Sequence, residues 1–327
     1  MRISTRTLTA ALSILAAASI QVPAWAADEY PSRPVSLVIP YGAGGAFDIT
    51  ARLLANVSQK HLGQQLVPTL KPGGGATIGT AFVARAKPDG YTLVYAANSS
   101  LTIAPLLEDP GYTKDDFIPV GKITHLTYVV GVRADKPWKN LNDLLAYVRN
   151  NQKSVVFGAT GIPGLSTIGQ SLLLKAGNVN YVPPMVPFKG VGEQILSVMK
   201  GDTDYMIQIY LGLLPQIRAK ELRVLAVLDD ARSPFIPDAP TAKELGYNIS
   251  LNMWLAVLAP KGTPEPILAK LSTAIAGMVK DPAFVEAMAK IDSPIIYQGR
   301  PEFQAFWNEE YKSYGNLIEQ QGLRKKK

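Results

Sequence analysis

The residues with the clearest binding chemistry lie in the glycine-rich segment Tyr41–Asp48, which follows the short apolar run Val35–Ile39. Such a run is typical of a buried strand, and Pro40 ends it. Glycines let backbone amides approach a ligand closely, because no Cβ stands in the way. Asp48 is a good helix cap, with apolar residues at helical spacing behind it. Free amides at that helix start, together with the helix dipole, favour a bound anion.

This segment resembles two nucleotide-binding motifs without matching either. A phosphate loop requires a lysine after its second glycine, and the segment contains none. The dinucleotide pattern GxGxxG requires glycine where this chain has Phe47. A plain strand-to-helix turn without a ligand remains the alternative.

A strand, a glycine loop and a helix occur a second time, at Ser154–Phe157, Gly158–Gly164 and Leu165–Ala176. Two such units facing each other would hold an anion between two helix starts. A polar loop, Ala97–Ser100, also follows the predicted strand Thr92–Ala96, and in open α/β sheets ligands collect beyond the carboxyl ends of strands. Because every α/β chain repeats this unit, coincidence is the alternative.

No catalytic constellation stands out in the sequence. The two histidines, His61 and His125, are far apart, and both positions fit structural roles better than catalysis. The chain has no cysteine, which excludes disulfides, cysteine nucleophiles and thiolate metal sites. Asp48 could serve as a general base, but a helix-capping residue needs no such role. We therefore expect a protein that is not an enzyme and that needs no cofactor or metal.

The first 26 residues have the pattern of an export signal. Arg2 and Arg6 precede the largely apolar stretch Leu8–Ile20, and residues 24–26 fit a small-x-small cleavage site. We expect cleavage after Ala26 and a periplasmic mature protein. No second stretch is long and apolar enough to span a bilayer.

The charge of the mature chain is only modestly positive. Removal of the leader, which carries two arginines and no acidic residue, lowers the formal net charge from +7 to +5. The C-terminal run Arg324–Lys327 is typical of a solvated tail rather than of a nucleic-acid patch. No nucleic-acid-binding motif appears elsewhere.

Strand and helix patterns alternate along the chain, which favours an α/β fold with parallel sheets. The extended apolar runs Leu126–Val132 and Leu251–Ala259 are interpreted as crossings between two lobes. Lobe 1 would comprise residues 27–125 and 252–327, and lobe 2 residues 126–251. Further strands are predicted at Gln65–Leu70, Tyr181–Pro187, Asp204–Ile209 and Leu222–Leu228, and further helices at Thr77–Ala86, Trp138–Asn150, Leu213–Ala219, Pro264–Val279, Pro282–Ile291 and Pro301–Gln321.

A series of short motifs covers nearly the whole mature chain: Tyr30–Pro34, Pro40–Asp48, Ala51–Arg52, Pro88–Leu93, Val186–Gly190, Leu222–Val227, Ala239–Thr241 and Leu258–Pro264. In this order they resemble the solute-binding proteins of tripartite tricarboxylate transporters, the Bug family. The resemblance implies an α/β, type II-like periplasmic binding protein, or Venus flytrap, with two crossover strands. It also implies capture of a small organic carboxylate for two membrane subunits of such a transporter.

Carried over residue by residue, the resemblance implies ligand contacts in both lobes. In the first lobe they fall on Tyr41, Gly42, Ala43, Gly44, Gly45, Phe47, Asp48, Asn98, Ser99 and Ser100. In the second lobe they fall on Thr160, Gly161, Leu165 and Ser166, and on Gln208, where the family usually has aspartate.

Three departures from the family pattern bear on the ligand. Phe47 stands where the family commonly has a small hydroxyl residue, Ala43 replaces a frequent proline, and the loop before Ser166 carries fewer hydroxyls. We therefore expect a ligand with one carboxylate and an aromatic or hydrocarbon body. In the alternative interpretation, Phe47 and Leu165 simply turn into the lobe cores.

The expected mode of action is binding by a monomer, with no nucleic acid involved. Two other functions stay open. The protein could present its ligand to a receptor kinase as a sensor, or it could be a periplasmic hydrolase or lyase that turns the compound over.

Overall fold

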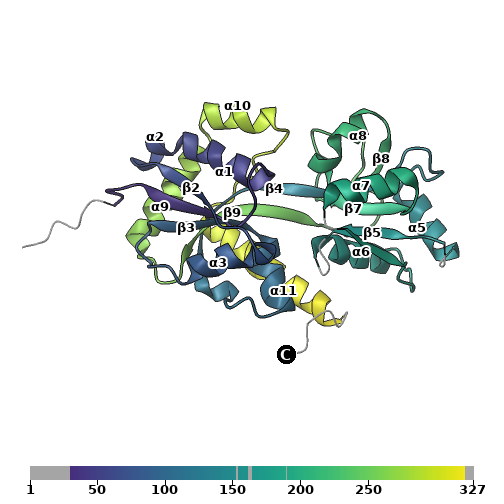
Figure 1. Cartoon of the computed structure of the whole chain (residues 1–327), viewed down its shortest axis with the longest axis horizontal. Helices are drawn as coiled ribbons and strands as arrows, with labels where there is room; N and C mark the ends of the chain where they lie inside the picture. The colour runs from purple at the N-terminus through teal and green to yellow at the C-terminus, as the bar shows by residue number, and fades with distance from the viewer. Residues whose placement is uncertain (1–29, 152–153, 161–163, 189, 321–327) are drawn as a thin grey trace, which may run out of the picture.

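The computed structural model describes residues 30–151, 154–160, 164–188 and 190–320. Over these residues the strands form one mixed sheet in the order β2-β1-β3-β9-β4-β7-β5-β6, with β8 paired to β4 (Figure 1). The strands are β1 Val35–Ile39, β2 Leu66–Leu70, β3 Thr92–Ala97, β4 Phe117–Arg133, β5 Phe157–Thr160, β6 Met185–Phe188, β7 Tyr205–Ile209, β8 Leu222–Val227 and β9 Asn252–Pro260.

The helices cover this sheet from both faces. They are α1 Ala46–Asn56, α2 Ser58–Leu62, α3 Thr77–Ala84, α4 Ala104–Leu107, α5 Leu141–Asn150, α6 Leu165–Ala176, α7 Val191–Lys200, α8 Leu214–Arg218, α9 Glu265–Met278, α10 Pro282–Lys290 and α11 Arg300–Gln320. A single π-helical turn, Ser99–Ile103, leads into α4. No helix in the described part of the chain combines the length and the apolar character that a membrane span requires.

The first lobe is built on β1, which is parallel to both β2 and β3. Successive side chains of β1 point to opposite faces, and both faces are buried. Leu37 and Ile39 pack with α1, α9 and α10, whereas Val38 packs with α3 and α11. A short strand that is apolar at nearly every position therefore becomes the centre of this lobe.

The second lobe repeats the arrangement around β5, which is parallel to β6 and β7. Apolar residues of α5 and α6, such as Leu144 and Ile168, pack on one face of its strands. Val198 of α7 and Leu214 of α8 pack on the other face. Figure 1 shows the two groups of helices separated along the long axis, with β4 and β9 running between them.

Strand β4 joins the two lobes by changing its partners. Residues Phe117–Thr127 pair with β9, whereas Tyr128–Val132 pair with β7 and Val129–Arg133 with β8, all antiparallel. These antiparallel pairs make the sheet mixed, while the predicted parallel pairing holds among the outer strands of each lobe. Near its C-terminal end α11 contributes Leu317 and Ile318 to the apolar core of the second lobe.

The structure corrects several predicted elements. Residues 97–100 are not a simple loop, because Ser99–Ile103 forms a helical turn. Helix α5 begins at Leu141 rather than at Trp138, because the side chain of Asn140 accepts a hydrogen bond from Asp143 N and so starts the helix. Strand β6 begins only at Met185, because two prolines precede it and lack the N–H that a sheet requires.

Candidate functional site

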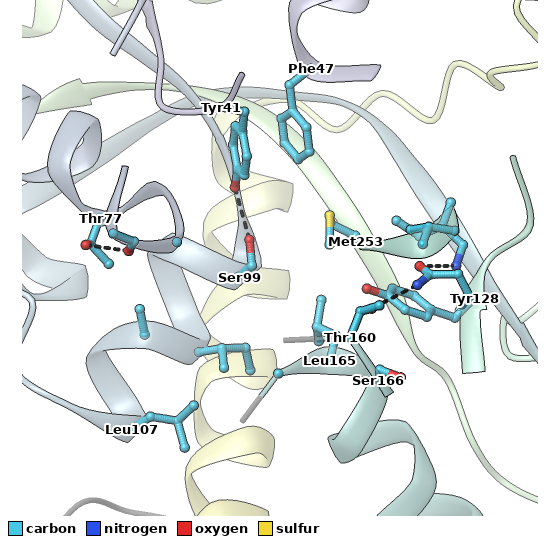
Figure 2. Close-up of a pocket in the computed structure, with 18 of the residues that line it drawn as sticks. Tyr41, Phe47, Thr77, Ser99, Leu107, Tyr128, Thr160, Leu165, Ser166 and Met253 are labelled. Carbon is cyan, nitrogen blue, oxygen red and sulfur yellow. Dashed lines mark hydrogen bonds between the residues drawn. The ribbon is translucent and has the colours of Figure 1, made fainter. Parts of the chain in front are cut away.

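A cavity of about 530 Å³ lies between the two lobes (Figure 2). Its size is in the range of small-molecule sites. Its described wall is formed by Tyr41, Phe47, Gly74, Gly75, Thr77, Ser99, Ile103, Ala104, Leu107, Glu108, Tyr128, Thr160, Gly164, Leu165, Ser166, Val191, Gln208, Ile209 and Met253. Both lobes and both of the strands that connect them contribute residues to this wall.

Two aromatic rings form the upper wall on the side of the first lobe. The rings of Tyr41 and Phe47 are stacked, with centroids 3.5 Å apart and an angle of 19° between their planes. The Tyr41 hydroxyl lies 3.0 Å from Ser99 Oγ. Phe47 also packs into the core of its lobe, so it serves both the core and the cavity wall.

Polar groups of the second lobe are already ordered by bonds to one another. Gln208 Nε2 donates to Thr160 Oγ1 and to Gln194 Oε1, both at 3.0 Å, and Gln208 Oε1 accepts from Ile209 N at 2.8 Å. Ser166 donates its hydroxyl to the carbonyl of Ile207. The Thr160 hydroxyl accepts from Gln208 and shows no donated bond to any residue in the described ranges, so its proton is available to a ligand.

The start of α6 faces the same cavity. Gly164, Leu165 and Ser166 all line it, and Leu165 is buried at the same time in the lobe core. In the first turn of a helix the backbone amides have no helical acceptor. The Thr167 hydroxyl accepts from the amide of Gly164. The amides of Leu165 and Ser166 show no acceptor among the described residues, and amides at this position suit an anion.

The described wall is largely apolar and carries no cationic side chain. None of the described lining residues is lysine or arginine, and the carboxylate among them belongs to Glu108, at the end of α4. Hydroxyls of Ser99 and Thr160 and the amides at the start of α6 supply donors. Aliphatic side chains of Ile103, Leu107, Leu165, Val191, Ile209 and Met253 make up much of the remainder.

The first glycine loop does not line the cavity. Gly42, Ala43, Gly44 and Gly45 are exposed beside it. Helix α1 begins at Ala46 after Gly45, so Asp48 lies within the first turn and is not the N-cap residue. Its carboxylate accepts from Gly44 N (2.9 Å) and from Arg52 Nε (2.7 Å). Asp48 therefore orders the loop, as a capping residue would, but from inside the helix.

Asn98 and Ser100 also lie off the wall. Asn98 is buried and donates through Nδ2 to the carbonyl of Asn252 and to Glu310 Oε1. Ser100 is buried and donates to the carbonyl of Ala97. Of the three predicted contacts in this loop only Ser99 lines the cavity, because the helical turn points its neighbours inward. Gly161, another predicted contact, lies outside the described residues.

Several wall residues were not predicted from the sequence, among them Ile103, Ala104, Leu107, Glu108, Val191 and Ile209. Gly74, Gly75 and Thr77 belong to the glycine loop that precedes α3, and this loop carries the same strand–glycine–helix signal as the loop before α1. Tyr128 and Met253 lie on the crossing strands. No local pattern marks them, because their exposure to the cavity depends on the register of β4 and β9.

Both histidines contact aspartate side chains away from the cavity. His61 Nε2 lies 2.9 Å from Asp281 Oδ2, which Lys60 also contacts at 2.8 Å. His125 Nε2 lies 2.6 Å from Asp229 Oδ2, and Thr127 Oγ1 donates to the same oxygen. Within the described residues no cluster of His, Cys, Asp and Glu side chains is suited to hold a metal ion.

The two-lobed sheet with a cavity at its crossing strands defines the class of periplasmic binding proteins. The model of one family, the tripartite tricarboxylate transporter family receptor (TctC), matches residues 50–323. The chain belongs to this family. It is 36% identical to a UPF0065 protein of Agrobacterium vitis over 287 residues, which are 87% of this chain and 82% of that protein. It is 30% identical to protein BugT of Bordetella pertussis, over 98% of this chain and 99% of that protein.

Solved structures of relatives share this fold. The periplasmic binding protein BugD is 31% identical, with a TM-score of 0.73 over 91% of this chain and all of that chain (100%). MatC from Rhodopseudomonas palustris, solved with bound malate, is 28% identical, with a TM-score of 0.71 over 88% of this chain and 100% of its own. An R. palustris protein solved with adipate is 25% identical, with a TM-score of 0.74 over 90% of this chain and 99% of its own.

Proposed function

We propose that this protein captures an organic anion with one carboxylate and an aromatic or hydrocarbon body, and releases it unchanged. The observation that carries the proposal is the composition of the interlobe wall, which combines neutral donors with a large apolar area. Relatives solved with malate and adipate support the carboxylate, since both of those ligands are carboxylic acids. The apolar side chains support a ligand body less polar than malate.

The carboxylate would bind where donors from the two lobes converge. Ser99 and Tyr41 approach from the first lobe, and Thr160 with the start of α6 approaches from the second (Figure 2). Amide and hydroxyl donors can satisfy a carboxylate without a cationic partner. The hydrocarbon part would then lie against Phe47, Leu165 and Met253. Removal of this apolar surface from water would stabilise the complex.

Binding would favour the closed arrangement of the lobes. We assign lobe 1 to residues 27–125 and 252–327 and lobe 2 to residues 126–251, supported by the change of strand partners at Thr127 and by the start of β9 at Asn252. A ligand that touches both lobes makes more contacts when they close, and so shifts the population toward that state. Micromolar affinity requires about 8 kcal/mol in total.

The biological setting follows from the family. A periplasmic monomer, exported by a leader that is cleaved after Ala26, would deliver its ligand to the membrane subunits of a tripartite tricarboxylate-type transporter. Among the proposed ligand contacts we retain those on the wall: Tyr41, Phe47, Ser99, Thr160, Leu165, Ser166 and Gln208.

A thermal-shift screen tests this proposal. Benzoate, phenylacetate and hexanoate should raise the melting temperature, because a ligand that binds only the folded state stabilises it. Malate, citrate and glutamate serve as small polar comparisons. Incubation of the purified protein with the best acid, followed by chromatography, should return the acid unchanged. A shift with the polar acids alone would contradict the apolar body, and a new product would contradict binding without turnover.

A further inference from the structure

Glu310 of α11 holds the turn that carries Ser99, although it does not itself line the cavity. Its Oε1 accepts from Asn98 Nδ2 at 3.0 Å and its Oε2 from Thr102 Oγ1 at 3.2 Å. Both oxygens lie 2.9 Å from Trp254 Nε1. Asn98, Thr102 and Trp254 are each fully buried, so the carboxylate is the inward end of a side chain whose stem is partly exposed.

The bonds of Glu310 fix both ends of the turn. Asn98 directly precedes Ser99, and Thr102 directly precedes Ile103, and both Ser99 and Ile103 are wall residues. Ala104 and Leu107 continue the wall along α4, which the turn leads into. A change at Glu310 therefore changes the position of one side of the cavity.

The donors around Glu310 match a carboxylate and not a carboxylic acid. An ionised carboxylate only accepts hydrogen bonds, whereas a protonated one must donate through one oxygen. Thr102 Oγ1 already accepts from Trp307 Nε1 at 2.8 Å, and Asn98 reaches Glu310 through its NH₂ group. A proton on Glu310 would therefore force at least one of these bonds to break or reverse.

We propose that Glu310 is a positioning residue that orders the Ser99 turn when ionised, so that ligand affinity rises with pH. The proposal rests on the proposed function and adds a form of regulation to it. It assigns the pH response to a group outside the cavity, where no ligand atom reaches.

The surroundings place the titration of Glu310 in a useful range. Burial raises the pKa of Glu310 to about 7, although hydrogen bonds from Asn98, Trp254 and Thr102 and the charge of Lys122 oppose that rise. The titratable groups that face it are Lys122 on β4 and Tyr314 on α11. Burial lowers the pKa of Lys122 and raises that of Tyr314, and the carboxyl of benzoate stays ionised above pH 6.

The test compares Glu310→Gln with Glu309→Gln, its exposed neighbour on the same helix. Calorimetry with benzoate or hexanoate, whichever binds the wild type more tightly, is run from pH 6 to pH 8. The wild type and Glu309→Gln should gain about fivefold in affinity over this range. Glu310→Gln should bind about tenfold more weakly at pH 8 and show a flat profile. A flat profile in Glu310→Gln beside a sloping profile in Glu309→Gln identifies Glu310 as the group that responds to pH.

A measurement on the wild type guards against misfolding of the variant. The indole Nε1–H resonance of Trp254 should shift with pH as Glu310 ionises. Because the coupling between ligand binding and ionisation is reciprocal, bound benzoate or hexanoate should lower the pH midpoint of that shift. An unchanged midpoint, or a Glu310→Gln profile like that of Glu309→Gln, would overturn the coupling while leaving the proposed function intact. If no carboxylate binds the wild type at any pH, the proposed function itself fails, and the coupling with it.

Discussion

Single residues of this cavity offer hydrogen-bond donors to an anion, and none of the described wall residues is lysine or arginine. Thr160 is the clearest case, because Gln208 donates to its oxygen and thereby directs its proton outward. The Ser99 hydroxyl forms a hydrogen bond with the Tyr41 hydroxyl at 3.0 Å. The cavity therefore presents donors whose positions are set before the ligand arrives, which lowers the entropic cost of binding.

Replacement of Thr160 by valine should weaken carboxylate binding about tenfold to a hundredfold. The substitution keeps the shape but removes a hydrogen bond to a charged group, which is worth about 1.5–3 kcal/mol. Titration calorimetry measures the loss. Thr69→Val, the same change on the exposed side of β2, is the control and should bind as the wild type does. Equal affinities for the two variants would remove Thr160 from the site.

The stability of the fold should fall with pH through Glu310. Its pKa is raised from 4.5 to about 7 in the native state, so between these values the folded chain binds more protons than the unfolded chain. The extra proton bound by Glu310 in the native state therefore contributes fully to the free energy of unfolding below pH 4.5. This contribution is lost as the pH rises through 7. At about 1.4 kcal/mol per pKa unit, it amounts to about 3 kcal/mol at most.

Denaturant titrations of Glu310→Gln between pH 5 and pH 8 check this sign. The free energy of unfolding of the variant should depend less on pH than that of the wild type. A steeper decline in the variant would contradict the raised pKa. Affinity and stability should thus respond to pH in opposite directions through one carboxyl group.

Among the elements, α1 departs most from its expected role. Its first turn does not face the cavity with free amides, because Asp48 already accepts from Gly44 N and pairs with Arg52. The helix instead contributes the ring of Phe47. Helix α6 has no acidic residue in its first turn, and Gly164, Leu165 and Ser166 at its start line the cavity.

Replacement of Asp48 by alanine should therefore act mainly on stability. Loss of the loop bond and of a negative charge at a helix start should cost about 1 kcal/mol, seen as a lower denaturation midpoint. Carboxylate affinity should fall by less than about threefold. Asp115→Ala, which removes an exposed ion pair, is the control. A loss of affinity as large as that of Thr160→Val would place Asp48 at the ligand.

Local patterns predicted the elements better than the site. Helix α6 lies at the predicted Leu165–Ala176, and β1 at the predicted Val35–Ile39, because apolar spacing and glycine boundaries are local signals. The side chain of Asn98 is held inward by a hydrogen bond to Glu310, more than 200 positions later in the sequence. A local sequence pattern contains no information about such a distant partner. The same holds for the strand register that exposes Tyr128 and Met253 to the cavity.

At the scale of the whole molecule, β4 and β9 link two lobes with separate apolar cores. Tyr128 and Met253 line the cavity where these strands pass from one lobe to the other. A ligand on this wall contacts both lobes and their connection together. Its binding is therefore expected to be coupled to closure, and small-angle scattering should record a smaller radius of gyration with the acid bound.

The most direct test compares a carboxylate with its neutral amide. Calorimetry of the wild type with benzoate and benzamide, or with hexanoate and hexanamide, isolates the charge from the hydrocarbon body. The carboxylate should bind one site per chain at least about tenfold more tightly, because the donors of Ser99, Thr160 and the α6 start suit an anion. Salt should change this affinity little, because no described lysine or arginine lines the wall. Equal affinity for acid and amide would contradict the account.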